Sequence, residues 1–190
     1  MIFRSPDPDM SIPARSLSEF VMDQFGALGD APAVVDGPTG RTLTYAQIQA
    51  GTRRMAVGLI RRGMNKGDAF AMRLPNVPEC ATAFLGVAAA AGVVTTMNPL
   101  MTSEEIRDQL QDTKAQGLLT LAPLAERARD AALGTPVREI FCLGDAPETL
   151  PYAALLAQDG PLPHVAIDPT RISSRCPTPA APAACPRVSC

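Results

Sequence analysis

The sequence predicts an α/β fold, a parallel sheet with helices on both faces. Short apolar or β-branched runs alternate with amphipathic stretches of about ten to fifteen residues, and glycine or proline residues punctuate many of the junctions. That alternation is typical of right-handed βαβ units. The predicted strands of the sheet are residues 69–74, 93–97, 117–120 and 137–143.

Length and composition indicate one folded domain. The chain has 190 residues, of which 46% are hydrophobic and 19% charged, enough for a sizeable core. The net charge of -2 provides no excess of positive charge that would attract nucleic acid, so no nucleic-acid partner is expected. The longest apolar run, 80–94, is shorter than the ~20 residues of a membrane span. With no secretory leader at Met1, these features predict a cytoplasmic protein without a membrane span.

Before the sheet, the sequence predicts an arm and a first helix. Residues 1–15 are rich in Pro and Asp and are expected to be extended. Ser16 and Glu19 have the spacing of a capping box, which predicts a helix start. Gly26 and Gly29 are expected to end this helix.

A hairpin and a long helix follow. The runs 33–36 and 42–44 flank turn residues and predict two antiparallel strands. Thr44 and Gln47 form a second capping box, and Gly63 is expected to end the helix that starts there.

The helices between the sheet strands have their own start and stop signals. Pro78 is suited to the first turn of one helix, because its missing N–H costs nothing there. Thr102 with Glu105 predicts a third capping box, where Glu104 and Glu105 favour the helix dipole and need no catalytic role. Pro123 opens a further helix. Residues 152–156 are expected to add one helical turn, and 158–171 a connector.

The residues taken alone assign no catalytic, cofactor-binding or metal site. The only histidine, His164, lies in a Pro-flanked connector and lacks a partner that would make it a base. Cys176, Cys185 and Cys190 contain no CxxC pair and do not predict zinc. Lys66 is expected to be a solvated turn residue. Cys80 and Cys142 lie in apolar segments and are expected to be small core residues with reduced thiols.

Several segments in a fixed order carry a resemblance. Gly40-Arg41-Thr42-Leu43-Thr44-Tyr45, Leu74-Pro75-Asn76-Val77-Pro78-Glu79 and Asn98-Pro99-Leu100 with Thr102 and Glu105 are the clearest, and the opening arm and the Gly63–Asp68 turn add to them. Over residues 2–171 the chain thereby resembles the N-terminal part of adenylate-forming enzymes, in the branch of 4-coumarate–CoA ligases and acyl-CoA synthetases.

The resemblance implies a fold, a reaction and cofactors. Residues 16–171 would be the N-terminal part of an AMP-binding domain, an incomplete piece of the adenylate-forming fold with an unpaired strand edge. The family's full-length enzymes use ATP, Mg²⁺ and CoA to convert an aryl or acyl carboxylate to an acyl-adenylate and then to an acyl-CoA. For this fragment no cofactor, no substrate binding and no ligase activity are expected.

Residues 172–190 differ in composition from everything before them. They contain four Pro and three Cys but no Asp, Glu or Lys. The resemblance places the family's phosphate loop here, shortly after residues 167–171. The segment can be back-translated and each codon boundary moved one base upstream. In that shifted frame the codons can encode Ser-Ser-Gly-Thr-Ser-Gly-Leu-Pro-Lys-Gly, which is the sequence of the family's phosphate loop. We therefore expect 172–190 to be a non-native tail, produced by a one-base deletion that truncates the enzyme.

Two alternatives remain open at this point. The chain could be a small non-catalytic α/β interaction module whose Pro/Ala-rich tail is a genuine linker. It could also be a regulatory fragment that binds full-length partners. The sequence names neither the carboxylic acid of the intact enzyme nor the oligomeric state.

Overall fold

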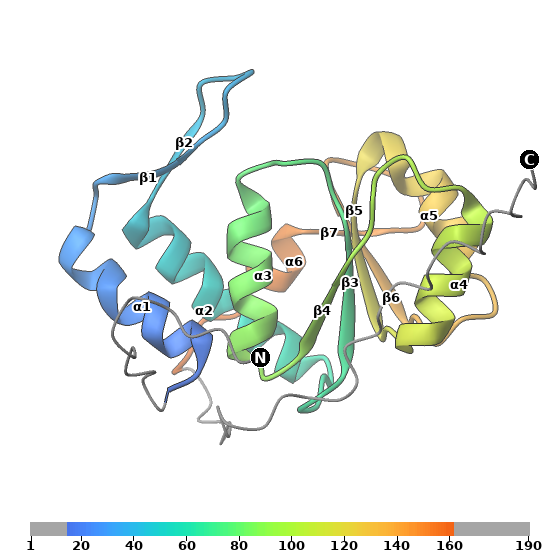
Figure 1. Cartoon of the computed structure of the whole chain (residues 1–190), viewed down its shortest axis with the longest axis horizontal. Helices are drawn as coiled ribbons and strands as arrows, with labels where there is room; N and C mark the ends of the chain where they lie inside the picture. The colour runs from blue at the N-terminus through green and yellow to red at the C-terminus, as the bar shows by residue number, and fades with distance from the viewer. Residues whose placement is uncertain (1–14, 162–190) are drawn as a thin grey trace, which may run out of the picture.

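The computed structural model describes residues 15–161, and their centre is a five-stranded sheet in the order β4-β3-β5-β6-β7 (Figure 1). All four strand pairs are parallel. The α/β class and the parallel sheet are therefore confirmed. The strands are β3 (Ala69–Arg73), β4 (Val93–Thr96), β5 (Gly117–Leu121), β6 (Glu139–Leu143) and β7 (Leu150–Pro151).

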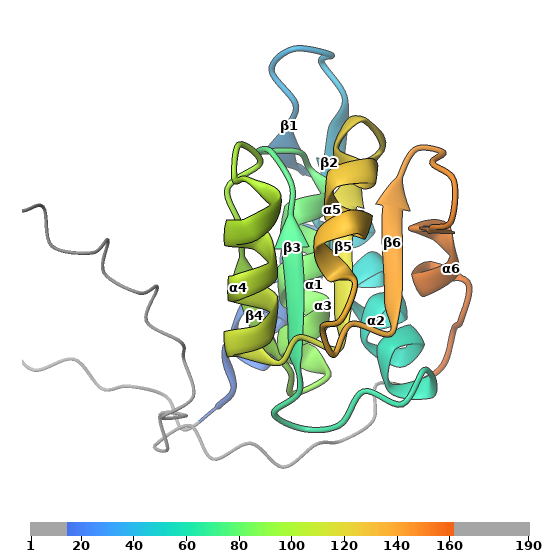
Figure 2. The ribbon, with the colours of Figure 1, turned by 90° about the vertical axis from the view of Figure 1, so that its right-hand side faces the viewer.

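Helices cover both faces of the sheet (Figure 2). One face carries α2 (Tyr45–Arg61), α3 (Glu79–Ala89) and the short α6 (Ala153–Leu156), while α1 (Leu17–Leu28) lies outside α2 and α3. The other face carries α4 (Ser103–Thr113) and α5 (Ala125–Ala132), which follows the 3-10 turn η1 (Ala122–Leu124). The change of face follows from right-handed crossovers, because β4 lies on one side of β3 and β5 on the other.

The three predicted capping boxes are all present, at Ser16, Thr44 and Thr102. In each box the N-cap hydroxyl accepts a hydrogen bond from the N–H three residues on, and that residue's side chain accepts one from the N-cap N–H. The predicted hairpin is also present, as β1 (Pro32–Val35) and β2 (Thr42–Thr44) in antiparallel pairing. Local sequence signals therefore set the starts of three of the six α-helices that the structure describes.

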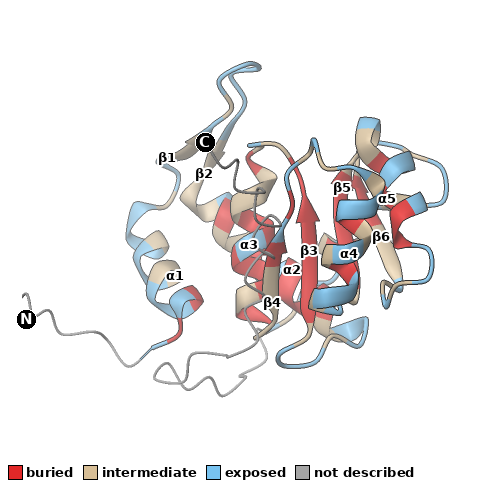
Figure 3. Cartoon of the chain, turned by 45° about the vertical axis from the view of Figure 1, so that its right-hand side comes forward, coloured by how far each residue is buried: buried red, intermediate tan, exposed pale blue. Residues whose placement is uncertain are grey.

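β3 separates two hydrophobic cores (Figure 3). All five of its residues are buried. Phe70 and Met72 pack in the core beneath α2 and α3, whereas Ala69 and Ala71 pack in the core beneath α4 and α5. This alternation is what a central strand requires, since successive side chains point to opposite faces.

The first helix differs from its prediction. It continues through Gly26 and ends at Leu28, and only Gly29 forms the C-cap, at a φ of 47°. The apolar residues Leu17 and Phe20 do not enter the core but are 57% and 43% exposed. A single glycine costs a helix only about 1 kcal/mol relative to alanine, which the Ser16 capping box offsets.

The sheet has one strand that was not predicted and one exposed edge. β7 has only two residues, too few for a periodic pattern, and it pairs with β6. At the other side, β4 pairs only with β3 within residues 15–161, so its outer edge has no strand partner there. The fourth predicted strand is shorter than expected and starts at Glu139.

Some predictions concern residues outside the described range. The extended arm, apart from Arg15, and the tail 172–190 lie there, as does most of the connector 158–171. Within the described part, no helix has the length and apolarity needed to cross a membrane. Cys142 is buried, as expected, whereas Cys80 is half-buried and its thiol donates to the carbonyl of Pro75 at 3.2 Å.

Gly58 allows α2 to contact α6 closely. A Cβ atom at this position would lie 2.0 Å from the carbonyl oxygen of Leu155. The backbone of Leu155 cannot shift to make room for a Cβ as the flexible end of a side chain could. We expect Gly58→Ala to lower the free energy of unfolding by about 1–3 kcal/mol, because the two helices must separate.

Gly26 provides a matched control for this measurement in urea. It also lies in a helix, but no described atom outside the neighbouring backbone of that helix comes within 4 Å of the place that a Cβ would occupy there. Gly26→Ala should raise the free energy of unfolding by up to ~1 kcal/mol. Equal effects of the two substitutions would show that the α2–α6 contact does not constrain residue 58.

Candidate functional site

The carboxyl ends of β3, β4 and β5 meet at one edge of the sheet, where ligands bind in open α/β folds. The chain leaves β3 toward α3 on one face, and it leaves β4 and β5 toward α4 and α5 on the other. The connections therefore diverge at this edge. Two of the three sequence segments that define the resemblance, 74–79 and 98–105, lie in these connections.

Arg73, the last residue of β3, is the main polar group at this edge and is completely buried. Its Nη1 donates to the carbonyl of Leu124 at 3.0 Å, and its Nη2 donates to the carbonyl of Pro99 at 2.5 Å. One guanidinium thus joins the loop after β4 to the turn after β5. Its Nε has no hydrogen-bond partner in the described structure.

The electrostatics of Arg73 are unusual, because no carboxylate pairs with it in the described part of the chain. Burial lowers the pKa of the Arg73 guanidinium from its ordinary value, and the positive charge of Arg127 acts in the same direction. The group nevertheless stays protonated, since an arginine does not lose its proton in proteins. Two backbone carbonyl dipoles take the place of a counter-ion.

A cavity of about 310 Å³ lies beside Arg73 on the α4–α5 face. Arg127, Glu126 and Asp130 contribute charges of both signs to its wall, and Ser103 contributes a hydroxyl. Arg127 also donates to the carbonyl of Met101 at 3.4 Å. Residues 15–161 include no histidine, because the only one in the chain is His164. This edge therefore has cations that could stabilise negative charge but no imidazole base.

An ion pair away from this edge joins two of the sequence segments that define the resemblance. Arg41, before β2, makes a bidentate pair with Glu79 at the start of α3, at 2.6 and 2.7 Å. Burial is the largest single influence on the pKa of Glu79 and acts to raise it. The hydrogen bond from Arg41, a backbone hydrogen bond and the charge of Arg41 together outweigh burial, so the pKa lies below its ordinary value. The hydrogen bond between the two side chains raises the pKa of Arg41. This pair attaches the hairpin to the sheet domain.

Other candidate residues have structural surroundings. Glu105 accepts hydrogen bonds from the N–H and hydroxyl of Thr102, and the backbone one chiefly lowers its pKa. Lys66 is exposed in the turn before β3, at the opposite edge of the sheet. His164 and the cysteines at 176, 185 and 190 lie outside the described residues. Of these candidates, only Glu105 and Lys66 lie within residues 15–161, and they stand at opposite edges of the sheet.

Arg73 was not singled out from the sequence. The run 69–74 predicts a short apolar strand, and that pattern gives Arg73 no separate role. A single charged residue within an otherwise apolar strand was the available signal, because arginine is almost never fully buried without a partner. What the sequence could not supply was the partner, which consists of two backbone carbonyls distant in the chain.

Comparison with known proteins gives a consistent family. The sequence profile described as AMP-binding enzyme matches residues 22–182, ending inside the segment 172–190. A 4-coumarate–CoA ligase of Petroselinum crispum is 34% identical over 171 residues, which are 88% of this chain and 31% of the relative. One from Arabidopsis thaliana is 40% identical over 131 residues, 66% of this chain and 23% of the relative.

Solved structures show the same fold. A long-chain-fatty-acid–CoA ligase from Archaeoglobus fulgidus superposes with a TM-score of 0.77 at 21% identity, covering 88% of this chain and 35% of that one. A benzoate–CoA ligase from Burkholderia xenovorans superposes with a TM-score of 0.70 at 18% identity, covering 77% and 29%. This chain therefore spans only about a third, or less, of the relatives it matches.

The buried bridge at Arg73 leads to a stability prediction. Arg73→Lys should lower the free energy of unfolding by about 1.5–3 kcal/mol, because a single ammonium cannot replace a planar fork that reaches two carbonyls. The same change at the exposed Arg127 should cost less than about 0.5 kcal/mol. Urea unfolding of both variants measures the difference, and a neutral Arg73→Lys would show that the bridge contributes no stability.

Proposed function

The chain belongs to the family of AMP-binding enzymes, and from this premise we propose that it is the N-terminal part of an acid–CoA ligase of the 4-coumarate–CoA ligase type. The observation that carries the proposal is the 34% identity to such a ligase across 88% of this chain. The ion pair between Arg41 and Glu79 supports it, because it joins two of the segments through which the sequence resembles the family.

The proposed reaction of the complete enzyme has two steps. A carboxylate oxygen of the acid attacks the α-phosphorus of ATP, which forms an acyl-adenylate and releases pyrophosphate. The thiol of CoA then attacks the acyl carbon, which forms the thioester and releases AMP. A flexible Gly- and Ser/Thr-rich loop, Mg²⁺ and a lysine meet the charge requirements of the first step.

Residues 15–161 do not themselves fit ATP and Mg²⁺. Within them no group of three or more His, Cys, Asp or Glu could hold a metal ion. At the carboxyl edge, Arg73 already donates to Leu124 and Pro99. The part of the chain that the structure describes is therefore proposed to act as framework, which positions the loops of the carboxyl edge, and no chemical step is assigned to its residues.

We further propose that a polypeptide of these 190 residues has no ligase activity. Mixed with ATP, Mg²⁺ and either 4-coumarate or a long-chain fatty acid, it should release no pyrophosphate above the background without acid. A full-length 4-coumarate–CoA ligase is the positive control for the assay. Acid-dependent pyrophosphate release by the 190-residue polypeptide would refute the proposed inactivity while leaving the ligase assignment intact.

The frameshift hypothesis for residues 172–190 has its own test. DNA sequencing from the Asp168 codon to several hundred bases past the stop should find ligase-like sequence continuing in the shifted frame. An additional base found before the Ile172 codon would show that the tail results from a DNA-sequencing error and that the gene encodes a longer ligase. Unrelated sequence after the stop would instead support a genuine Pro/Ala-rich tail and a non-catalytic module.

A further inference from the structure

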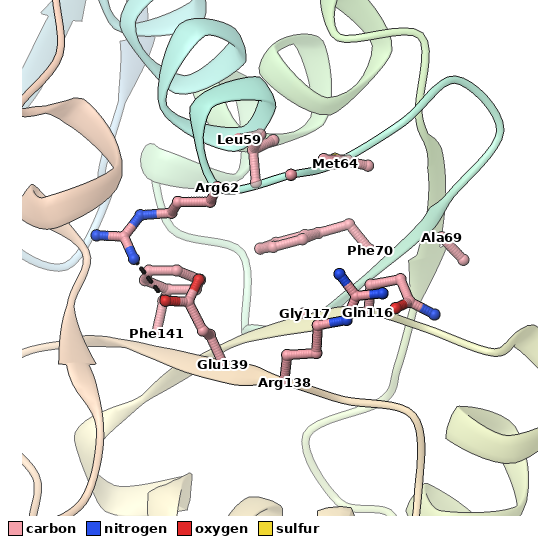
Figure 4. A pocket seen from close by; sticks show the side chains of 11 residues that line it. Leu59, Arg62, Met64, Ala69, Phe70, Gln116, Gly117, Arg138, Glu139 and Phe141 are labelled. Carbon is pink, nitrogen blue, oxygen red and sulfur yellow. Dashed lines mark hydrogen bonds and ion pairs between the residues drawn. The ribbon is translucent and has the colours of Figure 1, made fainter.

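A second cavity, of about 260 Å³, lies at the opposite edge of the sheet, where β3, β5 and β6 begin (Figure 4). The end of α2 and the turn after it cover the cavity from above in this view, and the strand starts form its floor. None of its lining residues belongs to the segments at the carboxyl edge. Binding in this cavity would therefore be independent of the proposed function.

The interior of this cavity is apolar and partly aromatic. Phe70 from β3 and Phe141 from β6 lie with their ring centroids 6.3 Å apart, and Leu59 and Met64 face them (Figure 4). Gly117 makes room for the Phe70 ring, because a Cβ there would lie 2.7 Å from Cε2 of Phe70. The ring can therefore lie directly against the start of β5. A flat apolar group would find contacts on several sides here.

The rim of the cavity has an excess of positive charge. Arg62 pairs with Glu139 at 2.6 Å, and its guanidinium carbon lies 5.2 Å from the centre of the Phe141 ring. Arg138 also lines the cavity, and its side chain has no hydrogen bond or ion pair with any residue of the described range. Two cations and one carboxylate leave a net positive charge beside an apolar interior.

We propose that this cavity binds a small amphipathic anion, with its apolar body against Met64 and the accessible edges of Phe70 and Phe141, and its carboxylate on Arg138. Charge complementarity selects the anion, because an unpaired guanidinium matches a carboxylate in a bidentate geometry. The volume limits the body to about one ring with a short chain, since it lies just below the ~300–1,000 Å³ of common ligand pockets. Glu139 opposes binding by occupying Arg62.

Titration of the ¹⁵N-labelled full chain with 3-phenylpropionate, followed by amide NMR shifts, tests the proposal. We expect saturable shifts that are largest at Gln116, Gly117 and Arg138. The neutral 3-phenylpropanamide should bind about tenfold more weakly, because it loses the charge-assisted hydrogen bonds. Absence of saturable shifts, equal affinity for acid and amide, or shifts centred elsewhere would each overturn the proposal.

Three variants separate a built site from general damage to the fold. Arg138→Gln, at an exposed position, should weaken the binding of the acid about tenfold and remove its advantage over the amide. Glu139→Gln should tighten the binding of the acid about threefold, because it frees Arg62, and loss of structure would not produce a gain. Arg127→Gln, at the opposite edge, is the matched control and should leave the affinity unchanged. An unchanged affinity in Arg138→Gln would show that this residue does not bind the anion.

Discussion

The double burial of β3 is the constraint on which the rest of the structure depends. Its five residues lie between β4 and β5 and are covered on both faces, so each must suit a dry environment. Four of them are apolar and alternate between the two cores. The fifth, Arg73, is polar, and the loops around it supply the carbonyls that make its burial possible. The positions of the β4–α4 loop and of η1 follow from that requirement.

The segments that identify the family have structural roles in this domain: they cap helices and connect distant parts of the chain. Thr44 and Thr102 cap helices, Glu79 fastens the hairpin through Arg41, and Pro99 accepts a hydrogen bond from the end of the central strand. The contacts of Glu79 and Pro99 connect segments that are distant in the chain. A sequence match in these segments therefore indicates a shared fold. The reaction chemistry requires groups that the described residues do not bring together.

Periodicity and capping residues predicted most of the fold because they act locally. The four main strands and the three capping boxes could be located from the sequence, since each depends on residues within a few positions of one another. β7 could not, because two residues carry no period. The exposure of Leu17 and Phe20 was also unpredictable, since the sequence pattern of α1 does not show what lies against it. The free energy cost of one glycine was too small to stop that helix at Gly26.

The two cavities were invisible to sequence reasoning for a related reason. Phe70, Gly117 and Phe141 come from three strands, and the wall opposite them comes from α2. Arg73 likewise meets carbonyls 26 and 51 positions away. Such sites depend on register between strands, which a single sequence does not encode locally. Only the assembled sheet shows which side chains share a space.

The alternation along β3 also places the two cavities diagonally. Phe70 faces α2 at the start of the strand, and Arg73 faces α4 and α5 at its end, about 10 Å along the chain at the rise of a parallel strand. A molecule in one cavity thus cannot touch a molecule in the other, because the sheet itself is the partition. The ladders from β3 to β4 and to β5 hold this partition in place on both sides. The two ends of this domain can therefore be altered independently.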